Sequence, residues 1–549
     1  MRTALNFLAL AAGLALAAPA GAQDLLIHGG PIYTGEAKVE ALAIKDGKVA
    51  FAGPLAQARA AAPGARDVDL KGAAAYPGFV DAHAHLSGIG FREMTLSLEG
   101  TPSIEALVER LKAWTAANPG SDAIVGRGWI ETHWPEKRFP TRADLDRAVP
   151  DRPVVLTRAD GHALVANSAM LTLAGVRRDT AAPAGGQILK DAAGEPTGML
   201  IDNAMGLVRA KTPPPSPEAE AEAVKRGAQV YAARGWTGLH DMSVGTREVA
   251  IQQALAARGE LPIRIDNYMS QADAEAVLRD GPSQDASGLV RVRGVKLFMD
   301  GALGSRGAAL LAPYADAEGT GLIVTPRETI DAILAKARKS GAQIAVHAIG
   351  DRGNRVILDA YQQAFADDPA ALKAARWRVE HAQILAPEDL PRFAQMGVVA
   401  SMQPSHAIGD LYFAPARLGP ERLKGAYAWE SLLKSGAVVA GGSDAPVEKG
   451  DPLVEFYAAA YRHDLKGFAG SDWHLDEAVT RAQALDMLTR GTAYAGFREN
   501  DLGRLAPGRP ADVSVFSVDL MTAPFADIAQ AHAVMTIVGG KVVYDAAKP

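Results

Sequence analysis

Residues 73–85 decide the fold of this chain, and they read Ala-Ala-Ala-Tyr-Pro-Gly-Phe-Val-Asp-Ala-His-Ala-His. An apolar run of this kind predicts a buried β-strand. Side chains at i and i+2 of a strand point to the same face, so His83 and His85 can reach one metal ion. The alternative is a chance pair of polar residues that closes a strand. Further ligands downstream, each at a strand end, would favour the metal site.

Four later apolar runs each carry such a residue. They are 292–301 with Lys296, 342–351 with His347, 377–383 with His381, and 438–446 with Asp444. Imidazole and carboxylate groups in this number predict a site for two metal ions. A protonated lysine repels a cation, so Lys296 fits this site if CO2 adds to its amine and gives a bridging carbamate.

These motifs, in this order, resemble the amidohydrolase superfamily, and within it the YtcJ-like group of the amidohydrolase-3 type. The resemblance covers nearly all of the mature chain. It implies that His83 and His85 hold one metal together with Asp444, that carbamylated Lys296 bridges, and that His347 and His381 hold the second metal. The related D-aminoacylases use a cysteine ligand, which this cysteine-free chain excludes. The motifs that carry the resemblance are Pro-Gly-Phe-Val-Asp-Ala-His-Ala-His, Val-Lys-Leu-Phe-Met-Asp-Gly-Ala-Leu-Gly-Ser-Arg-Gly-Ala-Ala-Leu, His-Ala-Ile-Gly-Asp-Arg, Val-Glu-His-Ala-Gln and Gly-Gly-Ser-Asp-Ala-Pro.

The composition is that of a large globular enzyme. The 549 residues carry a formal net charge of −6, and no basic patch with interleaved aromatic residues stands out. Nucleic acid is therefore not expected as a partner. The absence of cysteine excludes disulfides, thiolate catalysis and cysteine-bound zinc. Histidine, aspartate and carbamate ligands suit Zn²⁺, Mn²⁺, Fe²⁺ or Co²⁺, and two Zn²⁺ ions are expected.

The first 22 residues have the pattern of a signal peptide. A positive start, an apolar stretch from Ala4 to Ala18 and the small residues at 20–22 predict cleavage after Ala22. We therefore expect a periplasmic or secreted protein with no stable membrane anchor after cleavage. An uncleaved anchor is the alternative, although the apolar stretch is short for a membrane span.

The remaining chain predicts an α/β fold: a distorted (β/α)8 TIM barrel over residues 77–496, with a small β-sandwich built from both chain ends, 23–76 and 497–549. The pair Asp46-Gly47 between alternating segments indicates a hairpin. Helical runs at Ser103–Ala117 and Pro217–Arg234 alternate with strands, as in a parallel barrel.

Residues of about 100–235 are too many for two simple βα units. The family resemblance implies that this insertion forms a lid and part of the substrate pocket. The residues predicted to bind substrate are Trp129, Trp134 and His162 from the insertion, together with His240 at a strand end and Arg306, whose guanidinium can hold a carboxylate. The alternatives are that the tryptophans join the insertion to the barrel and that Arg306 forms a salt bridge with an acid of the protein.

The predicted activity is metal-dependent hydrolysis of a C–N bond in a small amide, N-acyl or N-formyl compound. Hydroxide formed at the metals would attack the carbonyl, and Asp444 would serve as general base and then as general acid. An ester, a lactone or a cyclic amide is the alternative substrate, and a non-catalytic binding protein on an inherited barrel is the alternative class. A homodimer is expected from the size of the barrel.

Overall fold

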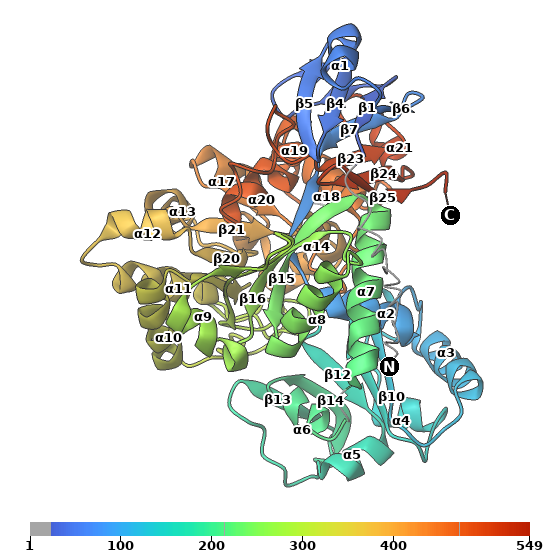
Figure 1. Ribbon diagram of the computed structural model, residues 1–549. Coiled ribbons are helices and arrows are strands. Elements are labelled where there is room, and N and C mark those ends of the chain that lie inside the picture. The colour runs from blue at the N-terminus through green and yellow to red at the C-terminus, as the bar shows by residue number, and fades with distance from the viewer. Residues whose placement is uncertain (1–22, 213–214, 471–472, 549) are drawn as a thin grey trace, which may run out of the picture.

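Eight parallel strands form the central sheet of the computed structural model, which describes residues 23–212, 215–470 and 473–548 (Figure 1). At Gly442, after the last strand, an added Cβ would lie 2.6 Å from the amide nitrogen of His83, so the sheet is nearly closed. The predicted TIM-like barrel is therefore confirmed. The strands, in hydrogen-bonding order, are β8 (Phe79–Ala84), β15 (Trp236–Val244), β16 (Arg264–Met269), β18 (Val290–Phe298), β19 (Gln343–Ala348), β20 (Arg378–His381), β21 (Val399–Met402) and β22 (Val439–Gly441).

Helices cover the outside of this sheet, because strands that are apolar on both faces must be buried on both. β19, for example, has every residue buried. The main helices are α2 (Leu86–Met94), α7 (Pro217–Arg234), α8 (Thr246–Ala257), α9 (Glu275–Asp280), α10 (Arg327–Ser340), α11 (Asp351–Ala364), α12 (Pro369–Ala375), α13 (Leu390–Met396), α17 (Trp429–Lys434), α18 (Pro452–Tyr461), α19 (Arg481–Leu488) and α20 (Arg490–Ala495). Shorter elements on the connections are β17 (Ser283–Gln284), which pairs with β18, and α14 (Pro404–Asp410), α15 (Ala414–Leu418) and α16 (Pro420–Leu423).

Helix α7 belongs to the barrel rather than to the insertion. It begins where the sequence predicts, with Ser216 accepting a hydrogen bond from the amide of Ala219. It lies against α2 so closely that a Cβ on Gly90 would meet the carbonyl oxygen of Ala223 at 1.8 Å. Only glycine fits this contact.

The insertion forms its own six-stranded sheet, drawn in cyan and green below the barrel in Figure 1. It starts at Leu96 and its last helix ends at Arg209, so it is shorter than the expected 100–235. Ser103 caps the predicted helix by accepting a hydrogen bond from Ala106 N. The elements are β9 (Leu96–Ser97), β10 (Ile124–Trp129), β11 (Val154–Arg158), β12 (Ala163–Ala166), β13 (Gly186–Lys190), β14 (Pro196–Asp202), α3 (Ile104–Ala117), α4 (Arg142–Asp146), α5 (Ser168–Ala174) and α6 (Met205–Arg209).

The two chain ends meet in a pair of sheets at the top of Figure 1, where blue and red ribbons lie together. β7 (Ala74–Pro77) pairs antiparallel with β23 (Val513–Phe516), which joins the N-terminal and C-terminal parts in one sheet. Asp46 and Gly47 both have positive φ and form the predicted turn between β4 and β5. The other elements are β1 (Leu25–His28), β2 (Ile32–Tyr33), β3 (Lys38–Val39), β4 (Ala41–Lys45), β5 (Lys48–Gly53), α1 (Leu55–Ala61), β6 (Arg66–Asp69), α21 (Phe525–Ile528), β24 (Ala533–Val538) and β25 (Lys541–Asp545).

The predicted signal peptide, residues 1–22, lies outside the described residues, and export stays a prediction. Among the described helices, none combines the length and the apolar character that crossing a membrane requires.

Candidate metal centre

One cavity of about 460 Å³ receives all six predicted ligands. Five of them lie at or just beyond the carboxyl ends of barrel strands, where parallel barrels carry their functional groups. Lys296 lies two residues before the end of β18. The six are His83, His85, Lys296, His347, His381 and Asp444.

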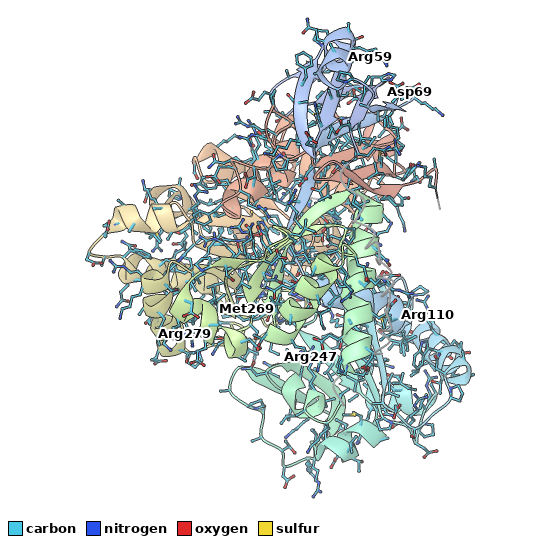
Figure 2. The ribbon with its side chains drawn as sticks, viewed as in Figure 1. Arg59, Asp69, Arg110, Arg247, Met269 and Arg279 are labelled. Atoms are coloured by element: carbon cyan, nitrogen blue, oxygen red, sulfur yellow. The ribbon has the colours of Figure 1, made fainter. Side chains whose placement is uncertain are left out.

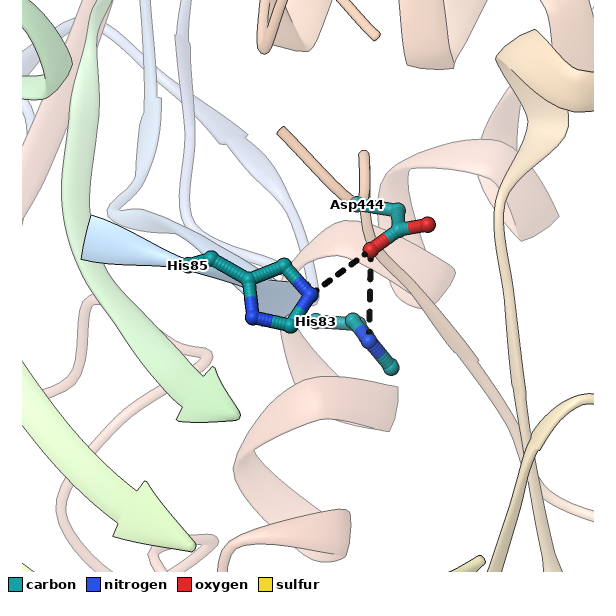
Figure 3. Close-up of side chains that lie close together, drawn as sticks. All are labelled: His83, His85 and Asp444. Atoms are coloured by element: carbon teal, nitrogen blue, oxygen red, sulfur yellow. Dashed lines mark hydrogen bonds and ion pairs between the residues drawn. The ribbon is translucent and has the colours of Figure 1, made fainter. Parts of the chain in front are cut away.

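His83, His85 and Asp444 form the closest group (Figure 3). The Oδ1 atom of Asp444 lies 3.1 Å from Nε2 of His85 and 3.3 Å from Nε2 of His83. The three side chains can hold one metal ion. Burial alone would raise the pKa of Asp444, but His83 and His85 outweigh it and lower the pKa, so the carboxylate is ionised.

A buried network fixes the ring of His83. Its Nδ1 lies 2.7 Å from Oε2 of Glu380, and the guanidinium of Arg378 donates to both oxygens of Glu380. An acceptor at Nδ1 fixes the proton there and leaves the lone pair of Nε2 directed at the cavity. Burial lowers the pKa of His83 well below its ordinary value, and the charge of Lys296 adds to this effect. Glu380 therefore orients a candidate metal ligand.

His85 and His381 are held in the same way by other acceptors. Nδ1 of His85 lies 2.9 Å from the carbonyl oxygen of Met242, and Nδ1 of His381 lies 2.8 Å from Oε1 of Gln403. The rings of His381 and His347 are 4.5 Å apart at their centroids. Burial lowers the pKa of His347 and of His381 well below the ordinary value, so these two imidazoles are neutral.

Two of these ligands adopt a backbone conformation that is costly for residues other than glycine. φ is +74° at His381 and +58° at Asp444. Strained backbone of this kind persists where the surrounding structure enforces it, and it is concentrated at functional sites. Here it turns both side chains into the cavity at the ends of their strands.

Lys296 lies in the middle of the cluster. Its Nζ is 3.2 Å from Nε2 of His83, and the residue is 1% exposed. Burial lowers the pKa of Lys296 to about 8, so a larger fraction of its amine is uncharged at neutral pH than in an exposed lysine. An uncharged amine is the form that reacts with CO2.

His406 is a residue of the site that the sequence reasoning missed. Its Nε2 is buried and has no hydrogen-bond partner among the residues that the structure describes. It lies 3.7 Å from Oδ2 of Asp444, and the ring stacks on His381. His381, His406 and Asp444 make a second group able to hold a metal. The signal was present: His406 follows β21, so the same search of strand ends would have found it.

The donors of this cluster fit a divalent metal. Imidazole nitrogens with fixed protons and an ionised carboxylate converge on one cavity, and His406 lines a second cavity that shares His347, His381 and Asp444 with the first. Such nitrogen and oxygen donors are the ligands of zinc and related ions.

His162 lines the same cavity from the insertion, as predicted for a pocket residue. Its Nδ1 lies 2.7 Å from Oδ1 of Asp202, and its ring is 4.9 Å from that of His347. Burial lowers the pKa of His162, but the hydrogen bond and charge of Asp202 outweigh it and raise the pKa.

Trp129 and Trp134 do not line the cavity. Both are buried in the core of the insertion, where their indoles donate to the carbonyl oxygens of Leu156 and Thr101. For Trp129 the cause is a β-bulge in β10. The register of β10 shifts between Arg127 and Trp129, and Gly128 has φ +100°, so Trp129 turns to the face opposite Arg127.

We expect Trp134→Ala to lower the free energy of unfolding by about 3–5 kcal/mol, because it removes a large buried side chain and its hydrogen bond. Thermal unfolding measures this effect. The exposed Leu173, 51% accessible, gives the control Leu173→Ala, which should change stability by about 0.5 kcal/mol or less. Unchanged stability with lost substrate binding would instead place Trp134 in the pocket.

His240 and Arg306 also lie elsewhere. β15 runs on to Val244, so His240 is inside the barrel below the cavity, where its Nδ1 lies 2.7 Å from Nη1 of Arg378. Arg306 is partly exposed and forms an ion pair with Asp316. The alternative of a salt bridge to an acid of the protein therefore describes Arg306 in this structure.

A parallel barrel with candidate histidine and aspartate metal ligands at its strand ends is typical of one class of metal-dependent hydrolases. The model of the amidohydrolase family matches residues 66–544. YtcJ of Bacillus subtilis, named as an amidohydrolase, is 36% identical over 94% of this chain and 99% of its own. The N-substituted formamide deformylase of Arthrobacter pascens is 28% identical over 95% and 98%. A metal-dependent hydrolase from Pyrococcus horikoshii has a similar structure, with TM-score 0.74 and 30% identity over 92% and 99%. This chain belongs to the amidohydrolase family and is a hydrolase.

Proposed function

We propose that this enzyme hydrolyses the C–N bond of a small amide, N-acyl or N-formyl compound. The observation that carries the proposal is the cavity that contains five buried or half-buried histidines, Lys296 and ionised Asp444. The relative that acts on N-substituted formamides supports the choice of a C–N bond.

Asp444 is the residue proposed to move the proton. Its Oδ1 lies beside the imidazoles of His83 and His85, while Oδ2 lies toward His406 and makes no hydrogen bond to a described residue. The carboxylate takes the proton from the attacking water and returns it to the leaving nitrogen. His406 has an unpartnered Nε2 near Oδ2, where it can hold an oxygen of the substrate or product.

The metals would be held by His83, His85 and Asp444 on one side and by His347 and His381 on the other, with carbamylated Lys296 between them. Bound divalent ions polarise a carbonyl group and lower the pKa of water. The protein supplies neutral imidazoles with fixed protons, and the network of Glu380 and Arg378 keeps His83 in place.

The proposal is tested by elemental analysis of the purified protein together with a panel of small amides, formamides, esters and lactones. We expect about two equivalents of a divalent metal and turnover of C–N substrates, lost after chelation and restored by added metal. Faster turnover of esters or lactones than of amides would reassign the substrate. A folded protein that binds no metal and turns over nothing after reconstitution would indicate a binding protein.

A further inference from the structure

The cavity has two walls of different origin. The barrel supplies the candidate metal ligands, and the insertion supplies a second set of side chains that the proposed reaction does not use. Two of these are the arginines Arg127 and Arg209.

Arg127 faces the cavity because of the alternation of β10. Ile124 and Gly126 are buried in the core of the insertion, and Val125 and Arg127 lie on the opposite face. One nitrogen of its guanidinium, Nη2, donates to the carbonyl oxygen of Ala159 at 3.2 Å. The other, Nη1, is buried without a partner. Among the described residues no carboxylate lies within 4.0 Å of it.

Arg209 ends helix α6 and reaches the same cavity. Within the described ranges its guanidinium makes no hydrogen bond and no ion pair. Arg110 on the outer helix α3 provides a contrast, since it donates to the carbonyl oxygens of Ser97 and Glu99 (Figure 2). Both side chains are exposed, and among the described residues Arg209 keeps its donors for water or for a ligand.

The acids of the cavity do not neutralise the two arginines, because each already has partners. Asp160 pairs with Arg158 at 2.5 Å, and Asp202 binds His162. Asp300 accepts three backbone hydrogen bonds, and Asp444 lies among the histidines. The insertion therefore presents unpaired positive charge to any molecule at the metal centre. Oδ2 of Asp202, also buried without a partner, is left for a donor such as an amide N–H.

We propose that Arg127 and Arg209 form a subsite for a carboxylate, so that the substrate is a small amide that carries a carboxylate group, as an N-acylated amino acid does. This proposal rests on the proposed C–N hydrolysis for the identity of the reacting bond. Nη1 of Arg127 is buried and has no hydrogen-bond partner among the described residues, whereas Arg209 is exposed. Guanidinium groups donate charge-assisted hydrogen bonds to carboxylates, so Arg127 would be the main donor of this subsite and Arg209 the second.

The first test compares two substrates of equal shape, N-acetylglycine and N-isobutylacetamide, in which a neutral isopropyl group replaces the carboxylate. We expect wild type to prefer N-acetylglycine. Arg127→Met should lower kcat/KM for N-acetylglycine roughly 10- to 100-fold and leave that for the neutral amide nearly unchanged. Arg127→Lys should recover part of the loss.

If Arg127→Met fails to fold, Arg209→Gln provides the same test, since the Arg209 side chain has no hydrogen bond or ion pair with a described residue to lose. Arg209→Gln should also lower kcat/KM for N-acetylglycine and leave kcat/KM for the neutral amide nearly unchanged. The matched control is Arg177→Gln, on the exposed surface of the insertion and outside the cavity, which should behave as wild type. Equal effects of the arginine variants on both substrates, or none, would overturn the subsite.

Binding of levulinate separates this proposal from the reaction. Levulinate has the shape of N-acetylglycine without a C–N bond, and 5-methylhexan-2-one is its neutral counterpart. By calorimetry, levulinate should bind to wild type and lose its affinity in Arg127→Met. If levulinate affinity is lost in Arg127→Met while wild type hydrolyses no amide, the proposed C–N reaction is refuted and the carboxylate subsite is retained. Unchanged levulinate affinity in a variant that still hydrolyses neutral amides would refute the subsite alone.

Discussion

Asp444→Asn is expected to keep much of its bound metal and to lose about 10²- to 10⁴-fold in kcat, the range that general acid–base catalysis contributes. Asparagine keeps an oxygen to face His83 and His85, but its amide cannot accept a proton from water and pass it on. Aspartate and asparagine side chains have nearly the same shape, so the substitution changes little of the packing. The backbone at this position is also held in place, because the backbone N–H of Asp444 donates to the carbonyl oxygen of His83 at 2.6 Å.

Steady-state kinetics and elemental analysis of the same preparation measure this effect. Asp367→Asn, which changes an exposed acid paired with Arg338, is the control and should match wild type. Turnover of Asp444→Asn within about tenfold of wild type would remove the proton-transfer role. A variant that loses both metal and activity would show that Asp444 acts mainly as a ligand.

Lys296→Ala is expected to lose most of the bound metal and nearly all activity, and to recover part of both with acetate or propionate. A short carboxylate can enter the space that the lysine leaves and take the place of the carbamate. The proposed carbamate would form by attack of the unprotonated Nζ on CO2: an N–C bond forms, one C–O π bond opens to leave the carbamate oxygen, and the amine releases a proton.

Metal content after gel filtration, with and without added carboxylate, measures this effect. A carbamate signal after incubation of wild type with ¹³C-bicarbonate, absent in Lys296→Ala, would give independent support. The exposed Lys339 supplies the control Lys339→Ala, which should keep its metal. A variant at position 296 with full metal content and activity would end the bridging role.

The barrel and the ligand cluster could be predicted because both depend on local patterns. The i, i+2 spacing of His83 and His85 and the apolar runs before His347 and His381 are visible in the sequence, and a parallel barrel brings strand ends together whatever the loops do. His406 follows the same rule less directly, because it lies four residues beyond the end of β21, within helix α14.

The pocket could not be predicted to the same degree, since it depends on irregularities and on distant contacts. One bulged residue at Gly128 turns Trp129 to the face opposite Arg127, and no propensity reveals it. The length of β15 places His240 in the interior. Arg306 is neutralised by Asp316, which a loop brings to it.

The separate core of the insertion has a consequence for how enzymes of this architecture diverge. Residues 96–209 pack around their own apolar clusters, apart from the main cluster of the barrel. Substitutions on the cavity side of that sheet can therefore change which molecules are admitted while the reacting centre stays intact. Two relatives with identical metal ligands can then act on entirely different substrates. The residues that align with Arg127 and Arg209 are the ones to compare first.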